Sequence, residues 1–175
     1  MKNSFLTSIV LALTIAGCVS APPLPGESQE QVISKLGKPS AIYRVQSGVH
    51  DDMLLNDGLL NDILLEYATG PFGQFTYMAR IGQDGRLVSY EQVLTDAKFA
   101  TVLVGITTKE EVLHTFGRPA ETSYLPRQKL EVWSYRYKQS GVWDGMMHVH
   151  FDDQAIVRMM QGGPDESKER RSFFR

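Results

Sequence analysis

The sequence predicts an α+β fold made of two tandem repeats, each with one or more short helices packed on an antiparallel sheet of three or four strands. Two nine-residue stretches, VISKLGKPS at 32–40 and VLHTFGRPA at 112–120, share the order valine, apolar residue and Gly-x-Pro. Each stretch is followed by segments with the alternating pattern of strands. Because the start, apolar stripe, stop and following strands all recur, we interpret the chain as a duplication of one unit.

Each nine-residue stretch is predicted to end a short helix. Ser28 and Thr108 each stand three positions before a Gln or Glu, which is the spacing of a capping box. Gly37 and Gly117 stand where a left-handed C-terminal cap is favoured, and the proline two positions later prevents the helix from resuming. Helices of about nine residues are not stable alone in water, so their apolar stripes must pack on a sheet.

The strands follow the helix in both copies. The predicted strands lie at 41–45, 63–68, 72–81 and 86–93 in the first copy and at 121–125, 130–137, 142–151 and 155–161 in the second. Between the copies, LTDAKFATVLVG predicts a short extra helix capped by Thr95 or Asp96. The first copy has instead an insertion at 46–62, which is either a partner-binding loop or a long hairpin whose leucines cover the edge of the core.

The N-terminus predicts export and lipid attachment. An apolar run of 13 residues at 5–17 follows Lys2; a helix needs about 20 residues to cross a bilayer, but this length suits a secretory signal peptide. The sequence IAGC at 15–18 resembles the bacterial lipobox, which implies cleavage before Cys18 and acylation of that residue by a diacylglycerol thioether and an N-acyl chain such as palmitate. Val19 in place of Asp implies sorting to the outer membrane, on its periplasmic side.

These features divide the chain into five parts. We expect a lipoprotein signal peptide at 1–17, a proline-rich tether at 18–25, a first repeat at 26–94, a second repeat at 95–161 and a flexible tail at 162–175. The 18 basic residues nearly balance the 20 acidic ones, so no basic field for nucleic acid is present. Cys18 is the only cysteine, and it therefore cannot form an internal disulfide.

The second copy resembles a known repeat. The stretch GITTKEEVLHTFGRPAETSYLPRQKLEVWSYRY is similar to the SmpA/OmlA repeat of BamE-like outer-membrane lipoproteins; the matching elements are Gly105, Thr107, Thr108, Val112, Leu113, Gly117-Arg118-Pro119 and Trp133-Ser134-Tyr135. The first copy keeps Gly26, Ser28, Val32, Gly37 and Pro39, but has Leu65-Glu66-Tyr67 where Trp-x-Tyr is expected. The tandem arrangement also looks like the beta-lactamase inhibitor protein, in fold only.

The resemblance implies a lipid-anchored interaction module that contacts envelope proteins, among them components of outer-membrane barrel assembly. The alternative is a periplasmic enzyme inhibitor or a ligand-sensing binding protein. The residues that we predict as interaction candidates are large apolar or adaptable side chains on two neighbouring strands and the strand that follows them: Trp133, Tyr135, Trp143, Met146, His148, His150 and Met159.

The period of two predicts which of these residues share a face. Trp133 and Tyr135 lie on one face of their strand, either packed under the helices or available to a partner. On the next strand, Met146, His148 and His150 are expected to face solvent together with Asp144. Two histidines without a third clear ligand do not predict a metal site.

No catalytic motif is apparent in the sequence. It contains no Gly-x-Ser-x-Gly, His-Glu-x-x-His or glycine-rich phosphate loop, and the Gly-Lys run at 37–38 is followed by Pro39, which has no N–H group to offer a phosphate. We therefore expect a protein that is not an enzyme and needs no cofactor.

Overall fold

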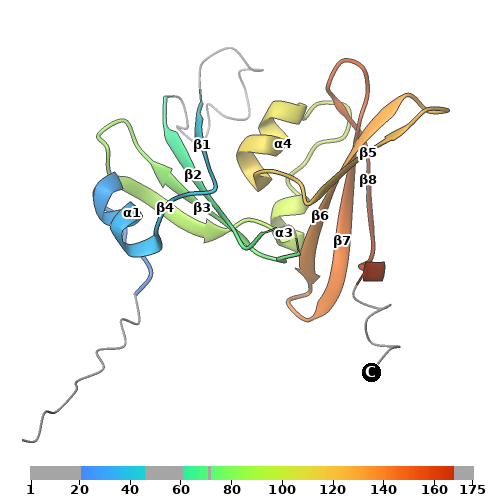
Figure 1. The fold of residues 1–175 in the computed structure, drawn as a ribbon. Helices are drawn as coiled ribbons and strands as arrows, with labels where there is room; N and C mark the ends of the chain where they lie inside the picture. The colour runs from blue at the N-terminus through green and yellow to red at the C-terminus, as the bar shows by residue number, and fades with distance from the viewer. Residues whose placement is uncertain (1–20, 46–60, 71, 168–175) are drawn as a thin grey trace, which may run out of the picture.

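Two antiparallel sheets of four strands each form the body of the protein in a computed structural model that describes residues 21–45, 61–70 and 72–167 (Figure 1). Each sheet is a meander whose strands lie in chain order. The first sheet consists of β1 (Ala41–Arg44), β2 (Ile63–Ala68), β3 (Thr76–Ile81) and β4 (Leu87–Gln92), and the second of β5 (Glu121–Leu125), β6 (Leu130–Gln139), β7 (Trp143–Phe151) and β8 (Val157–Pro164). The described helices are α1 (Gln29–Leu36), α3 (Asp96–Phe99) and α4 (Lys109–Phe116). The α+β class is therefore confirmed, with sheet as the main component.

Both predicted capping boxes are present. The Ser28 hydroxyl accepts from the backbone N–H of Gln31, and the Thr108 hydroxyl accepts from that of Glu111; each N3 side chain accepts in return from the backbone of its cap. The extra helix α3 is capped by Thr95, one of the two residues expected for that position. These local hydrogen bonds explain why such short helices start where they do.

The two C-terminal glycines do not adopt the expected left-handed cap. Gly37 has φ 83° and ψ −168°, and Gly117 has φ 76° and ψ −163°. The positive φ was expected, but ψ is extended, and this combination is open essentially to glycine alone. The requirement for glycine is therefore stricter than a left-handed cap would impose.

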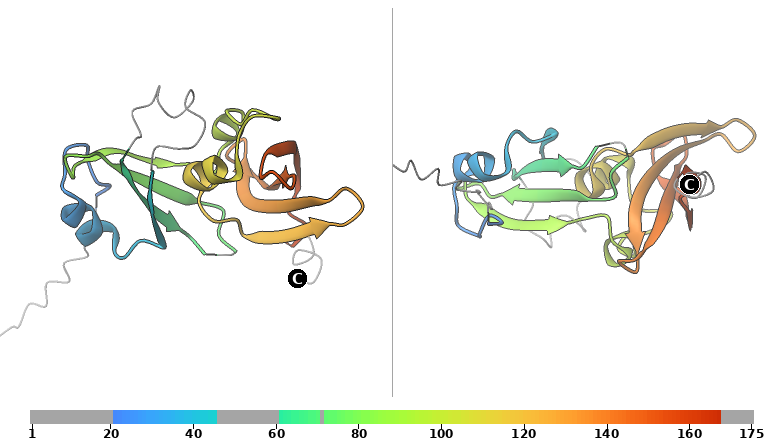
Figure 2. Two further views of the ribbon diagram at one scale, coloured as in Figure 1. Left: turned by 90° about the horizontal axis from the view of Figure 1, so that it is seen from above. Right: turned by 60° about the horizontal axis from the view of Figure 1, so that its bottom comes forward.

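Helix α4 lies between the two sheets (Figures 1 and 2). Helix α1 covers one face of the first sheet, where Val32 packs with Leu65, Ala79, Ile81 and Leu87. The opposite face of that sheet carries Leu64 and Met78, which join Phe99, Phe116 and Tyr135 of the second half in one larger core. Since Leu64 and Leu65 are neighbours on one strand, the first sheet is packed on both faces.

The larger core is rich in aromatic rings. Phe99 stacks on Phe116 with ring centroids 4.7 Å apart and meets Tyr137 edge-on at 5.0 Å, while Trp133 lies 5.1 Å from Phe151. Such pairs stabilise a core beyond the effect of their buried area. The face of β6 that carries Trp133 is therefore packed under the helices.

Two element boundaries differ from the prediction by three residues or more. Residues 72–75 form a loop, and β3 begins only at Thr76. Strand β8 continues to Pro164 and is followed by the buried Asp165. The prediction that a flexible tail begins at residue 162 is therefore wrong. Cys18, the signal peptide, the start of the tether and most of the 46–62 insertion lie outside the described residues. Within the described ranges, no helix is both long and apolar enough to cross a membrane.

Candidate functional site

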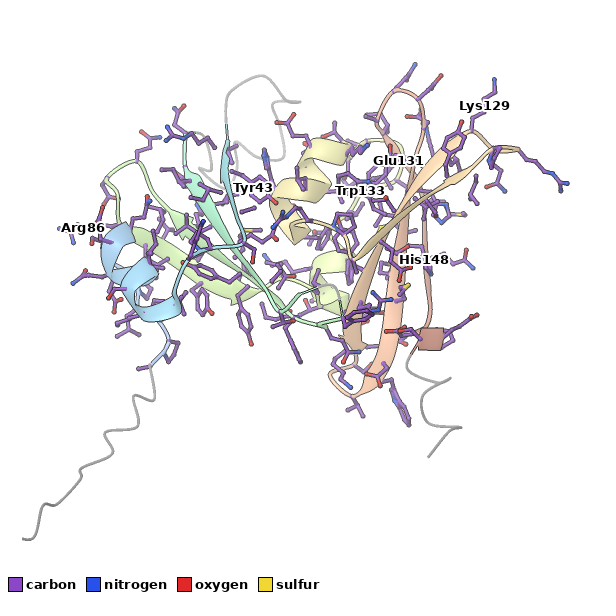
Figure 3. All side chains as sticks on the ribbon, viewed as in Figure 1. Tyr43, Arg86, Lys129, Glu131, Trp133 and His148 are labelled. Atoms are coloured by element: carbon purple, nitrogen blue, oxygen red, sulfur yellow. The ribbon has the colours of Figure 1, made fainter. Side chains whose placement is uncertain are left out.

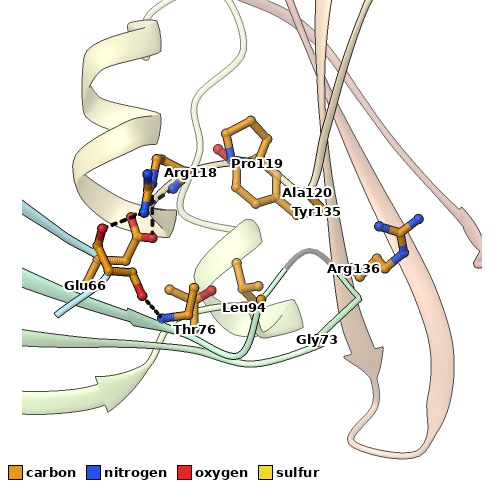
Figure 4. Close-up of a pocket in the computed structure, with 12 residues that line it drawn as sticks. Glu66, Gly73, Thr76, Leu94, Arg118, Pro119, Ala120, Tyr135 and Arg136 are labelled. Carbon is orange, nitrogen blue, oxygen red and sulfur yellow. Dashed lines mark hydrogen bonds and ion pairs between the residues drawn. The ribbon is translucent and has the colours of Figure 1, made fainter. Parts of the chain in front are cut away.

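A buried carboxylate, Glu66, connects the two halves of the protein. It lies on the face of β2 that points to α4, with its side chain only 1% exposed. The Tyr43 hydroxyl donates to its Oε2 atom at 2.5 Å. The backbone N–H of Arg118 donates to the same atom at 3.0 Å, and the Arg118 guanidinium lies 3.5 Å from Oε1 (Figure 4). Arg118 also donates to the carbonyl oxygen of Ser40 at 2.6 Å. Arg118 therefore links the end of α4 to β2 and to Ser40, the residue before β1.

Tyr43 lies on the side of α4 opposite Trp133 (Figure 3). Burial, and then the hydrogen bond to Glu66, raise the pKa of the Tyr43 phenol well above its ordinary value. The phenol therefore stays protonated and remains a donor. The Tyr43 ring also contacts His114 of α4 at 5.7 Å between centroids.

A cavity of about 280 Å³ opens beside the Glu66 contact, between the two halves (Figure 4). Its polar lining comes from Ser40, Glu66, Thr76, Arg118, Tyr135 and Arg136. Glu66 and Arg118 pair with each other, and Arg136 pairs with Asp165 at 3.2 Å and with Glu121. The charges of the cavity are thus compensated internally, and the described lining contains no histidine or cysteine to act as base or nucleophile.

The loop before β3 and the hairpin between β6 and β7 are bonded to each other. The Gln74 amide donates to Asp144 at 2.6 Å and to the carbonyl of Tyr137 at 3.4 Å. The hairpin is also fixed to α3, because the backbone N–H of Ser140 donates to Asp96 at 2.6 Å. Both segments are therefore held in defined positions.

These two bonded segments expose four large apolar side chains. We call this set the apolar end: Phe72, Phe75, Val142 and Trp143, which are 63%, 41%, 65% and 71% exposed. Phe72 also lies over the guanidinium of Arg136 at 5.7 Å. Large apolar side chains that are this exposed, in neighbouring loops with fixed geometry, are typical of a binding surface.

The face of the second sheet that points away from α4 holds the histidines. We call it the outer face; it carries Val132, Ser134, Arg136, Met146, His148, His150 and Met159. The prediction that its strand β7 residues face solvent is wrong for Met146 and His150, which are only 8% and 5% exposed. Ser134 and His148 share a hydrogen bond of 2.8 Å, whereas neither ring nitrogen of His150 has a partner.

The structure divides the predicted interaction residues among three places. Trp133 and Tyr135 are buried in the core, so they offer no surface to a partner. Met146, His148, His150 and Met159 come together on the outer face, and Trp143 alone is at the apolar end.

Several residues of the site are not predicted from the sequence, among them Phe72, Phe75 and Glu66. Phe72 and Phe75 were assigned to a strand, although Gly70 and Gly73 beside them could have indicated a loop. Glu66 was noted only as a departure from the Trp-x-Tyr pattern. A charged residue at the centre of an apolar strand was the available signal that it has a buried partner.

No family model, no curated protein and no solved structure matches this chain.

Proposed function

We propose that this protein is a lipid-anchored interaction module on the periplasmic side of the outer membrane, without enzymatic activity of its own. Its role is accessory to outer-membrane protein assembly or envelope integrity. The observation that carries the proposal is the apolar end, in which Trp143 and its neighbours are exposed on segments that are bonded to a rigid body.

We also propose that the two halves are SmpA/OmlA-like repeats at 26–94 and 95–161. The support is the recurrence of one order of elements: a capping box, an eight-residue helix, a Gly-x-Pro stop and a four-stranded meander. The lipobox-like sequence ending at Cys18 agrees with this family and supplies the anchor.

The apolar end has the properties of a protein-binding surface. Trp and other aromatic side chains contribute most of the binding free energy in protein interfaces. Because Gln74 and Asp96 hold the loop and the hairpin in place, little conformational entropy is lost when a partner binds. An envelope protein with an apolar groove is the partner that this surface fits.

Complementation of a deletion strain tests the function. Loss of the gene should lower the levels of outer-membrane barrel proteins and increase sensitivity to detergent. The wild-type chain should restore both, and a Val142→Ser, Trp143→Ser double variant should not. Val88→Ser is the matched control, because Val88 is also exposed but lies on β4, away from the apolar end. Full rescue by the double variant would contradict the proposal.

Fractionation tests the anchor separately. Cys18→Ala removes the only thiol that can be acylated, so the protein should move from the membrane fraction to the soluble fraction. Equal membrane association of this variant and the wild type would show that the anchor is not a lipid on Cys18.

A further inference from the structure

The outer face contains a buried histidine without a partner. His150 is 5% exposed, and both of its ring nitrogens lack a hydrogen bond. Buried polar groups in proteins are nearly always paired, since an unpaired group loses its hydration and gains nothing in return. An imidazole nitrogen that has a lone pair and no hydrogen bond can bind a metal ion. His150 is therefore a candidate metal ligand.

Two further donor side chains lie next to His150 on the same face. Met159 is its direct cross-strand partner, and His148 is two residues earlier on β7. Directly opposite residues have Cβ atoms about 4.5–5.5 Å apart, and diagonal neighbours about 7–8 Å apart, which is within reach of long side chains. The register therefore places the imidazoles of His148 and His150 and the thioether of Met159 as neighbours on one small part of the outer face.

One ring nitrogen of His148 is held in place by a hydrogen bond. Its Nδ1 atom is 2.8 Å from the hydroxyl of Ser134, which leaves Nε2 for a ligand. A hydrogen bond to the second nitrogen is the usual way in which a metal-binding histidine is oriented. Met159 is 39% exposed, so the face can be reached from the β8 edge.

We infer that His148, His150 and Met159 form a binding site for a soft monovalent cation, Cu(I). Imidazole and thioether donors together favour Cu(I), whereas zinc sites use histidine with cysteine or carboxylate ligands. In the described residues, no group of three or more His, Cys, Asp and Glu side chains could hold a metal ion, so a zinc-type set is absent from this part of the chain. This site is distinct from the apolar end and does not depend on the proposed function.

Competition with a coloured Cu(I) chelator tests the inference. The full chain carrying Cys18→Ser, so that its only thiol cannot bind copper, is titrated without oxygen against Cu(I) held by bicinchoninate. It should remove one equivalent of Cu(I) from the chelator. Met159→Leu should lower the affinity about tenfold or more, as loss of a metal-site contact does. Leucine has nearly the volume of methionine, so this variant should fold.

The matched control is Met160→Leu. Met160 is the next residue, but it packs against the core on the opposite face of the sheet, so its replacement should leave Cu(I) affinity unchanged. His148→Gln should weaken binding as Met159→Leu does, and Zn(II) affinity should not depend on residue 159. Failure of the chain to remove Cu(I) from bicinchoninate, or equal Cu(I) affinity in the Met159 and Met160 variants, would overturn the inference.

Discussion

Gly37 and Gly117 are the C-terminal caps of α1 and α4 but have different neighbours. Both have a positive φ with extended ψ. A Cβ atom on Gly117 would lie 2.6 Å from the Glu66 carboxylate, whereas a Cβ atom on Gly37 would have no atom within 4 Å. Gly37 is therefore needed only for its backbone conformation. Gly117 is needed for its backbone conformation and also because a side chain there would collide with Glu66.

Alanine at the two glycines should separate these effects. Gly37→Ala should lower the free energy of unfolding by about 1–3 kcal/mol, the cost of a side chain in a backbone conformation that is essentially restricted to glycine. Gly117→Ala should cost about 1–3 kcal/mol more, because it also disturbs the buried hydrogen bonds of Glu66. Urea unfolding of both variants measures the difference, and equal losses would show that Glu66 moves away at no cost.

His114 gives the protein a dependence on mildly acidic pH. Burial lowers the pKa of its imidazole below the ordinary value of 6.5, although Glu110 and Glu111 oppose the shift. Below pH 6.5 the unfolded chain therefore binds a proton that the folded chain binds only at lower pH. His114 therefore leaves the free energy of unfolding unchanged above pH 6.5 and lowers it as the pH falls below 6.5.

The free energy of unfolding should be lower at pH 5.5 than at pH 7.5, and the difference should shrink in His114→Gln. Carboxylates with lowered pKa values, such as Glu131 and Asp152, lose stability only at more acidic pH, so they do not contribute in this window. Urea titrations at the two pH values measure the effect; an unchanged difference in the variant would assign the pH dependence to other groups.

At the scale of the elements, local rules predicted most of the fold. Capping boxes, glycine stops and alternating patterns placed α1, α4 and most strands within one or two residues, because these signals depend on neighbours in the sequence. The start of β3 and the end of β8 were missed. Their limits depend on distant partners, namely the hydrogen bond from Gln74 to Asp144 and the ion pair of Arg136 with Asp165.

The candidate site was less predictable than the fold for the same reason. The sequence placed Met146, His148 and His150 on one face, but the alternating pattern does not say whether a face is exposed. Trp143 lies on the same side of β7 as buried core residues and is exposed only because it stands at the tip of a hairpin. Phe72 and Phe75 belong to a loop that is bonded to the same hairpin through Gln74 and Asp144, which are 70 residues apart in the sequence.

Loss of each helix cap should affect a different part of the protein. Thr108→Ala and Ser28→Ala each remove one capping hydrogen bond and should cost about 1 kcal/mol. Because α4 packs between the sheets, Thr108→Ala should speed amide exchange in both sheets, whereas Ser28→Ala should speed it in α1 and the face that α1 covers. Exchange confined to α4 in Thr108→Ala would contradict a shared core.

At the scale of the whole molecule, the two sheets pack into one shared core around α4. The larger core takes residues from both halves, and Glu66 and Gln74 each bond across the boundary. A helix stripe in the sequence shows that a helix packs on a sheet, but not that it packs on two. The sequence therefore predicted two units without showing how they join.

Phe116→Ala should destabilise both halves together. Phe116 is fully buried and stacks on Phe99, so its removal should cost about 3–5 kcal/mol. Tryptophan fluorescence, which reports only the second half, and amide exchange in β2 and β3 should show a single unfolding transition. Separate transitions would mean that the repeats fold independently.

Cross-linking in intact cells tests most directly whether the apolar end binds a partner. A photoreactive amino acid at position 143 of the full chain should cross-link to a discrete membrane-fraction protein that belongs to outer-membrane barrel assembly. The same amino acid at position 88, which is also exposed but lies on β4, should give no such product. No cross-link from position 143, or the same products from both positions, would contradict an interaction module that binds through its apolar end.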